Sequence, residues 1–362
     1  MDDLHSLGPV LIDYSGVRAR CGHFGRPGET GYSMIMEMIV AQGSAGLVAP
    51  EGTSVTIGNF DGVHVGHQEL LRRTVARARA AGRMAVALTF SPHPVRFFSP
   101  GARFYEITGP REKAELIAAA GIDALVVESF GGDVGRMTPE EFARAILVRR
   151  LAARDVIVGY DFTFGRNRAG SPALLAGLGK SMGFDVEIVP PVLRGGAIVS
   201  STRIRELLLA GRVRAAGELM RRPYRLSGPV IRGAERGRKL GFPTANIAVI
   251  QELIPLPGVY VVEAEVSGER RLAVANVGFN PTFGENSLGV EVHILDFDGD
   301  LYGREIAVRF RERIRDERKF KSAEELVRQI RKDVQYAREI RLPAGSKPAG
   351  GSRDAAAAGG SA

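Results

Sequence analysis

Apolar and polar positions alternate in two different rhythms along the chain, and the first rhythm runs from about residue 53 to residue 200. Apolar runs of strand length stand at 55–57, 84–90, 124–127, 155–159 and 186–189. Helical patterns separate them: apolar residues recur at helix spacing after residue 68, 111–120 has a similar pattern, and Thr138, Pro139 and Glu141 form a capped helix start. Apolar strands that alternate with helices predict a Rossmann-like α/β fold, with a parallel sheet covered on both faces.

The second rhythm begins near Pro223, where strand-like runs follow one another with only turns between them. Runs 259–266 and 272–277 flank a short hairpin turn, and runs 290–297 and 305–310 flank a longer connection that starts at Asp298 and Gly299. This pattern predicts a closed antiparallel β-barrel. A helix with Ser322 as its cap should end the domain, with a buried stripe of Leu326, Ile330, Val334 and Ala337.

A chain of 362 residues is longer than one core usually organises, so we expect two domains. The two rhythms place the first domain at 51–210 and the second at 223–342, with a linker at 211–222. Residues 1–50 read as an extension of uncertain order, and the low-complexity residues 343–362 as a disordered tail.

The composition narrows the class of protein only a little. The formal net charge of +8 suits an anionic partner, but the basic residues are scattered through both halves. One cysteine excludes an intramolecular disulfide and a multi-cysteine zinc site. No apolar stretch is long enough to span a bilayer, and the N-terminus lacks the pattern of a secretory signal, so we expect a cytoplasmic protein without a membrane partner. The sequence leaves the oligomeric state open.

The first candidate site is the run from Gly58 to His67, Gly-Asn-Phe-Asp-Gly-Val-His-Val-Gly-His. His64 and His67 stand where a strand gives way to a helix, and a helix N-terminus attracts phosphate through its unpaired N–H groups. Glycines let the backbone approach a phosphate closely, and two imidazoles can donate hydrogen bonds to a transferring phosphoryl group. Zinc is the alternative, but no third or fourth ligand stands at a typical spacing. The run therefore predicts an ATP site.

The second candidate site combines a glycine-rich basic loop, 233–246, with a strand carboxylate. Exposed N–H groups of such a loop can hold phosphates, although many loops of this kind are plain solvated turns. The Gly-Lys-Ser/Thr ending of a Walker motif is missing. On the later strand, Val290, Val292 and Ile294 share one face, so Glu291 and His293 share the other. Glu291 should therefore face solvent or a site.

The first run resembles the His-x-Gly-His signature of the nucleotidylyltransferase superfamily. Three further segments (89–94, 158–165 and 200–205) make the first half similar to the FMN adenylyltransferase of bacterial bifunctional riboflavin kinase/FAD synthetases. The resemblance implies that FMN attacks the α-phosphorus of ATP, that His64 and His67 stabilise the transition state, and that pyrophosphate leaves. It implies ATP and phosphate contacts from Gly58, Asn59, Phe60, Asp61, Gly66, Ser201, Arg203 and Arg205. It implies flavin contacts from Asp161, Phe162 and Phe164.

The second half resembles the riboflavin kinase of the same family, through residues 242–246, 276–283 and 314–320. The resemblance implies that Thr244 and Asn246 hold Mg²⁺ with ATP phosphate oxygens, a donor set that suits this hard cation. It makes Glu291 the general base for the riboflavin 5′-hydroxyl. Gly237 and Lys239 would meet phosphate. The likeness spans roughly residues 51–341, and riboflavin, FMN, FAD and ATP would be its substrates and products.

Two alternatives remain at this point. Ser91 stands where the family commonly carries an acidic residue, so the first half could be a scaffold beside one active kinase. A basic nucleic-acid-binding protein would instead show clustered cations with stacking aromatics. Aromatic residues make up 7% of the chain, there is no Trp, and no such interleaving occurs. We therefore expect small-molecule partners and no nucleic acid.

Overall fold

The computed structural model describes residues 38–99, 101–131, 133–233, 236–279 and 288–340. The chain divides into two compact units, one of Met1–Arg205 with Leu219–Arg221, the other of Glu206–Glu218 with Arg222–Ala362. Helices α6 (Ser201–Leu209) and α7 (Val213–Met220) lie around the expected linker. The domain boundaries at 50, 210, 222 and 342 stay predictions. The expected tail, 343–362, lies outside the described residues.

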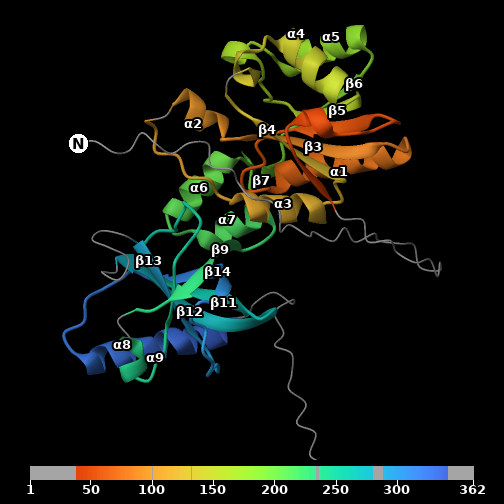
Figure 1. Ribbon diagram of the computed structural model, residues 1–362. Coiled ribbons are helices and arrows are strands. Elements are labelled where there is room, and N and C mark those ends of the chain that lie inside the picture. Colours follow the sequence, from red (N-terminus) through yellow and green to blue (C-terminus); the bar gives the residue numbers. More distant parts are fainter. Residues whose placement is uncertain (1–37, 100, 132, 234–235, 280–287, 341–362) are drawn as a thin grey trace, which may run out of the picture. The chain divides into compact units, whose positions relative to one another are not determined.

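The first unit is built on a parallel six-stranded sheet of order β1-β4-β3-β2-β5-β6 (Figure 1). The strands are β1 (Ile39–Gln42), β2 (Thr53–Ile57), β3 (Met84–Ser91), β4 (Ala124–Ser129), β5 (Ala153–Gly159) and β6 (Asp185–Val189). The predicted parallel sheet is confirmed. Regular structure in the described residues begins before the predicted domain start at residue 51, because β1 pairs with β4 at the sheet edge. Four residues carry too little periodicity to predict a strand.

Helices cover both faces of this sheet, and strand β3 shows why. Val86 and Leu88 point into one apolar cluster, whereas Ala85 and Ala87 point into another. The first cluster includes side chains of α4 (Pro139–Phe142), the π-helical η3 (Ala143–Arg150) and α5 (Pro172–Met182), and the second those of α1 (Val65–Ala80) and α3 (Pro110–Ala119) (Figure 1). Shorter elements are η1 (Ser44–Gly46), α2 (Pro94–Phe98), η2 (Val134–Arg136), η4 (Arg166–Arg168), β7 (Leu193–Arg194) and β8 (Ala197–Ile198).

Local signals decide where several helices start. The Thr138 hydroxyl accepts a hydrogen bond from the N–H of Glu141 at 3.2 Å, and the Glu141 carboxylate accepts one from the N–H of Thr138 at 2.8 Å. The predicted capping box is therefore confirmed.

The strand order also places the crevice in which an α/β sheet binds ligands. From β2 the chain continues to β3 and β4 on one side, then returns to add β5 and β6 on the other. Connections diverge at this switch point, and ligands bind outside the carboxyl ends of the strands there. The loops after β2, β3, β5 and β6 are therefore the place to look for a site.

The second unit is a closed antiparallel barrel of order β10-β13-β12-β11-β14-β9, with the short helix α8 (Arg236–Lys239) between β9 and β10 (Figure 1). Its strands are β9 (Tyr224–Ile231), β10 (Ala245–Ile247), β11 (Gly258–Val266), β12 (Glu269–Phe279), β13 (Leu288–Ile294) and β14 (Glu305–Arg315). Ser267 and Gly268 link β11 to β12 with φ angles of 52° and 83°, the conformation of a tight hairpin turn. The predicted barrel and hairpin are both confirmed.

Helix α9 (Ala323–Glu339) follows the barrel and begins where the sequence predicts, since the Ser322 hydroxyl accepts from the N–H of Glu325 at 3.3 Å. The expected buried stripe is correct only in part. Ala337 is buried, whereas Leu326, Ile330 and Val334 are half-buried.

The helix buries an unexpected carboxylate as well. Asp333 is 3% exposed and pairs with Arg315 of β14 at 2.8 Å. A periodicity argument counts apolar residues alone, so it misses a buried acid whose partner lies on another element.

None of the described helices, α9 included, is both long and apolar enough to span a membrane.

Candidate active sites

His64 ends the loop after β2 and caps α1. Its Nδ1 accepts hydrogen bonds from the N–H groups of Gly66 and His67, at 3.2 and 3.4 Å. A nitrogen that accepts carries no proton, so the proton of a neutral His64 sits on Nε2. The ring is 6% exposed, which holds this donor in a largely water-free place at the helix N-terminus. The cap thus fixes both the ring position and the tautomer.

His67 lies directly against His64. The two imidazole rings stack with centroids 3.7 Å apart and planes 16° apart. Phe60 supports His67 edge-on, with its ring centroid 5.4 Å away. Because the Phe60 side chain is fully buried, any nucleotide contact from this residue would have to come from its backbone. The structure brings the two predicted catalytic histidines together at the switch point of the sheet.

At two glycines between β2 and the first turn of α1, neighbouring side chains leave little room for a Cβ atom. A Cβ at Gly66 would lie 3.1–3.2 Å from ring atoms of His64, so a side chain here would press on the cap. Gly62 has a φ of +82°, and its Cβ would approach Ile107 at 3.1 Å. Gly58 and Asn59 are half-buried at the end of β2. The turn therefore depends on glycine for its shape, and the phosphate contacts of this loop stay predictions.

Asp61 is buried, with 1% exposure, and joins the loop to two distant segments. Its carboxylate accepts from Arg205 Nη2 at 2.6 Å, and its main-chain oxygen accepts from the Ser201 hydroxyl at 2.8 Å. The structure thus gathers Asp61, Ser201 and Arg205 in one network. Arg203 lies on the same helix, α6, but its Nη1 donates to the main-chain oxygen of Arg194 at 3.4 Å.

The three predicted flavin contacts follow β5 but differ in exposure. Asp161 is exposed and Phe162 is half-buried. Phe164 is 7% exposed and belongs to the apolar core, where it stacks against Phe162 with centroids 5.4 Å apart. In this arrangement Phe164 supports Phe162 from the core side. The flavin roles of all three residues stay predictions.

The loop after β3 adds residues that sequence reasoning missed. His93 caps α2, since its Nδ1 accepts from the N–H of Val95 at 3.2 Å, and its ring packs on Phe104 with centroids 4.4 Å apart. Burial lowers the pKa of His93 to about 4, and the charges of Lys113, Arg205 and Arg96 act in the same direction. His93 is therefore neutral at pH 7. The Ser-Pro-His-Pro pattern marked this segment, but only the fold shows what its histidine touches.

In the barrel, three polar residues share one row across neighbouring strands. Glu291 on β13 lies opposite Asn246 on β10 and opposite Asn276 on β12. Side chains of residues in register on adjacent strands stand about 5 Å apart on the same face. Glu291 and His293 are half-buried while their strand neighbours are buried, which confirms the predicted division of faces. Asn276 was not among the predicted site residues.

The Asn246 side chain lies beneath the start of the glycine-rich loop. Its Oδ1 is buried and makes no hydrogen bond to any described residue. A Cβ at Gly233 would lie 2.3–2.8 Å from the Asn246 side chain, so the glycine-rich loop passes directly over it. Thr244 precedes it by two residues, and its hydroxyl is 3.3 Å from where a Cβ of Gly237 would be. A buried amide oxygen and a hydroxyl two residues before it are oxygen donors of the kind that suits a hard cation such as Mg²⁺.

Other parts of the basic loop are described less fully. Gly237 and Lys239 lie in α8, and the Lys239 side chain lies outside the described atoms, as do residues 280–283 of the resemblance. Within the described residues, no group of three or more His, Cys, Asp or Glu side chains could hold a metal ion. A cation here would therefore rely on neutral oxygens and on the phosphates of its nucleotide.

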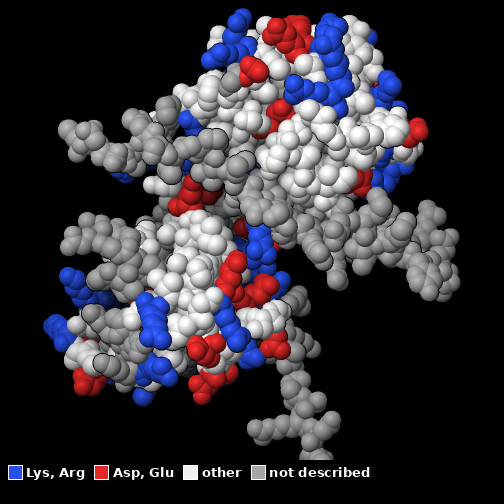
Figure 2. Space-filling model, in the orientation of Figure 1, with Lys and Arg blue, Asp and Glu red and all other residues white. Residues whose placement is uncertain are grey.

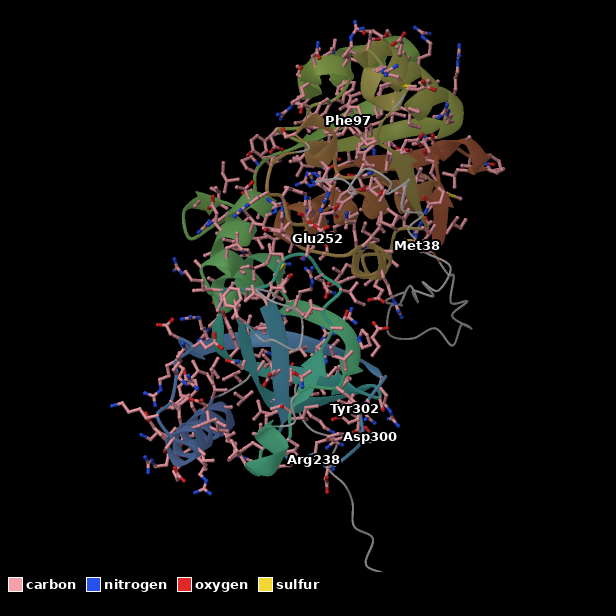
Figure 3. The ribbon with its side chains drawn as sticks, turned by 60° about the vertical axis from the view of Figure 1, so that its left-hand side comes forward. Met38, Phe97, Arg238, Glu252, Asp300 and Tyr302 are labelled. Atoms are coloured by element: carbon pink, nitrogen blue, oxygen red, sulfur yellow. The ribbon has the colours of Figure 1, made fainter. Side chains whose placement is uncertain are left out.

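The connection from β13 to β14 supports the start of this loop. Tyr302 and Asp300 lie on it (Figure 3), and the Asp300 carboxylate accepts from the N–H of Tyr302 at 3.0 Å. The Arg232 guanidinium lies over the Tyr302 ring, 5.6 Å from its centroid. A cation–π contact thus links this connection to the residue just before Gly233.

Comparison with known proteins identifies the family of each half of the chain. The family model for FAD synthetase matches residues 48–203, and the model for riboflavin kinase matches residues 220–341. The bifunctional riboflavin kinase/FMN adenylyltransferase of Escherichia coli is 38% identical over 80% of this chain and 93% of its own length. The enzyme of the same name from Pseudomonas fluorescens is 38% identical over 81% and 94%.

A solved structure resembles both units. The crystal structure of a protein named as a macrolide-efflux protein, from Streptococcus pneumoniae, superposes with a TM-score of 0.77 at 34% identity, over 84% of this chain and 99% of that one. A nucleotidyl-transfer sheet with stacked histidines at its switch point, followed by a kinase barrel, defines a two-domain transferase. The chain belongs to the family of bifunctional riboflavin kinase/FMN adenylyltransferases.

Proposed function

We propose that the barrel unit phosphorylates riboflavin to FMN, and that the α/β unit adenylylates FMN to FAD, each with one ATP. The observation that carries the second step is the stacked pair His64 and His67 at the N-terminus of α1. The row of Asn246, Glu291 and Asn276 supports the first step. Each unit supplies donors or acceptors that suit one phosphoryl chemistry.

In the α/β unit, an FMN phosphate oxygen attacks the α-phosphorus of ATP, and the bond from this phosphorus to the pyrophosphate oxygen breaks. Negative charge builds on the oxygens of the transferring group, and N–H donors held in place beforehand lower the barrier. His64 offers Nε2–H because the backbone occupies its Nδ1. Arg205, fixed against Asp61, offers a positive group for the departing phosphates.

In the barrel, the riboflavin 5′-hydroxyl attacks the γ-phosphorus, and the bond from this phosphorus to ADP breaks. Glu291 takes the hydroxyl proton as a general base. Thr244 and Asn246 would hold Mg²⁺, and the cation would supply positive charge against the ATP phosphates. Asn246 suits this role because its buried amide oxygen has no hydrogen-bond partner among the described residues.

The test separates flavins after purified protein is incubated with ATP and Mg²⁺ plus either riboflavin or FMN. His64→Ala should lower FAD formation by a factor on the order of 10²–10³ and leave riboflavin phosphorylation unchanged. Glu291→Gln should lower FMN formation by a factor on the order of 10²–10⁴ and leave FAD formation from added FMN unchanged. Equal loss of both activities in either variant would contradict two separate sites.

The wild-type protein decides between this proposal and its alternatives. FMN that accumulates without FAD would show that the α/β unit is a scaffold. No conversion of riboflavin or FMN would overturn both assignments. On the face drawn in Figure 2, Lys and Arg side chains are interspersed with Asp and Glu rather than gathered in one strip, which supports small-molecule substrates over nucleic acid.

A further inference from the structure

The carboxylate of Asp61 is fully used by the protein itself. Its Oδ1 accepts from the N–H groups of Ile107 and Thr108, at 2.8 and 3.2 Å, and its Oδ2 accepts from Arg205 Nη2 at 2.6 Å. With 1% exposure, it has no open side toward a ligand. A bare carboxylate would also repel a triphosphate, whereas a carboxylate paired to a guanidinium does not.

Arg205 is held on several sides at once. Its Nε donates to the main-chain oxygen of Tyr105 at 2.9 Å, and its guanidinium lies over the Phe104 ring, 4.6 Å from the centroid. The hydrogen bonds that the described residues make with this side chain use Nε and Nη2, so the N–H groups of Nη1 are available to a ligand. Phe104 in turn packs on the neutral ring of His93.

Three segments meet in this arrangement. The loop after β2 contributes Asp61, the loop after β3 contributes Phe104 and Tyr105, and α6 contributes Arg205. Ser201, at the start of α6, donates to the Asp61 main-chain oxygen and fixes the same helix a second time. An arginine that is ordered before the ligand arrives loses little freedom on binding and presents its donors in one direction.

We propose that Asp61 and Phe104 are positioning residues that act through Arg205, and that Asp61 does not contact ATP. This inference rests on the proposed adenylyl transfer, and it names the residues that orient the cationic group at that site. Misplacing a catalytic group by about 1 Å can cost roughly a hundredfold in rate.

The test is a double-mutant cycle on FAD formation from FMN. Asp61→Asn keeps an acceptor for Ile107 and Thr108 but removes the charge that holds Arg205. We expect Asp61→Asn and Arg205→Ala each to lower kcat/KM for ATP by about 30- to 100-fold, while KM for FMN stays the same. The double variant should be no slower than Arg205→Ala alone, because Asp61 acts through Arg205. Losses that multiply would overturn the proposal.

Phe104→Leu provides a second variant if Asp61→Asn fails to fold. We expect it to lower kcat/KM for ATP by about 3- to 10-fold, the value of a cation–π contact at a partly exposed site, and to have no effect in the Arg205→Ala background. An unchanged KM for FMN is the folding control for the α/β unit, and riboflavin phosphorylation by the barrel unit should not change. A further loss in the Arg205→Ala background would contradict the proposal.

A crystal structure of the Asp61→Asn variant tests the positioning role of Asp61 separately from the proposed adenylyl transfer. The positioning role predicts that the Arg205 guanidinium leaves the Phe104 ring, and an unmoved Arg205 would overturn it. If the wild-type protein makes no FAD at all, the proposed adenylyl transfer fails, and this structural comparison still decides the positioning role.

Discussion

The two sites are assembled by different physical means. In the α/β unit, loops that follow separate strands are tied together by a buried charge, since Asp61 joins two loops and α6. In the barrel, the row of Asn246, Glu291 and Asn276 follows from strand register alone. Loops need specific bonds to hold them, whereas a ladder of backbone hydrogen bonds aligns side chains without further help.

This difference teaches where each site is vulnerable. The first site depends on charge complementarity, and neutralising one carboxylate should disturb it. The second site depends on the absence of a side chain at Gly233, because only a glycine lets the loop lie this close to Asn246.

The largest effect on stability should come from the one buried ion pair that ties α9 to the barrel among the described residues. In Asp333→Asn, Arg315 keeps its charge but loses its partner, so the free energy of unfolding of the barrel unit should fall by about 3 kcal/mol. Urea unfolding measures this change. The matched control is Asp296→Asn, which removes the exposed pair with Arg338, whose side chains are 72% and 51% exposed. It should cost less than about 1 kcal/mol, and equal losses in both variants would contradict the distinction.

Gly233→Ala tests whether the barrel site depends on space. The new Cβ would lie 2.3 Å from the Asn246 amide and displace it. We expect kcat/KM for riboflavin phosphorylation to fall by roughly 10- to 100-fold, the cost of a displaced binding group. FAD formation from added FMN should stay the same. Gly177→Ala, at a helical position with open space around it, is the control and should leave both activities unchanged.

The titration of His93 should make the stability of the α/β unit depend on pH. Its folded pKa of about 4 lies below the ordinary value of 6.5. As pH falls below 6.5, the unfolded chain binds a proton that the folded α/β unit does not, so the unit loses stability until about pH 4. His93→Asn can still cap α2 but does not titrate. Between pH 7.5 and 4.5, wild type should lose on the order of 2 kcal/mol more than this variant. Parallel pH profiles of urea unfolding would contradict this prediction.

The smallest effects should come from two helix caps, one in each unit. Thr138→Ala and Ser322→Ala each remove a hydroxyl that accepts from a backbone N–H, at a cost of about 1 kcal/mol. If the units unfold separately, each variant lowers only the transition of its own unit. Hydrogen exchange resolved by peptide would measure this, and a shared loss in both units would show that they unfold together.

The sequence by itself predicted the features that depend on near neighbours along the chain. The parallel sheet, the barrel, the Thr138 and Ser322 caps and the face of Glu291 all follow from periodicity and capping within a few residues. The pairing of His64 with His67 at a helix start belongs to this group as well. Local physics is enough for the caps and the histidine pair because their interacting groups are three residues apart, and for the sheet and barrel the sequence periods show only which elements form.

Only the tertiary structure decided what distant residues do for one another. Asp61 and Arg205 stand 144 positions apart, and the family resemblance implies a nucleotide contact for each of them. The fold pairs the Asp61 carboxylate with Arg205, places the Arg205 guanidinium over the Phe104 ring, and puts Asn276 in register with Glu291. It also buries Asp333 against Arg315. These contacts depend on which strands and loops become neighbours in space, and a local pattern carries no record of that.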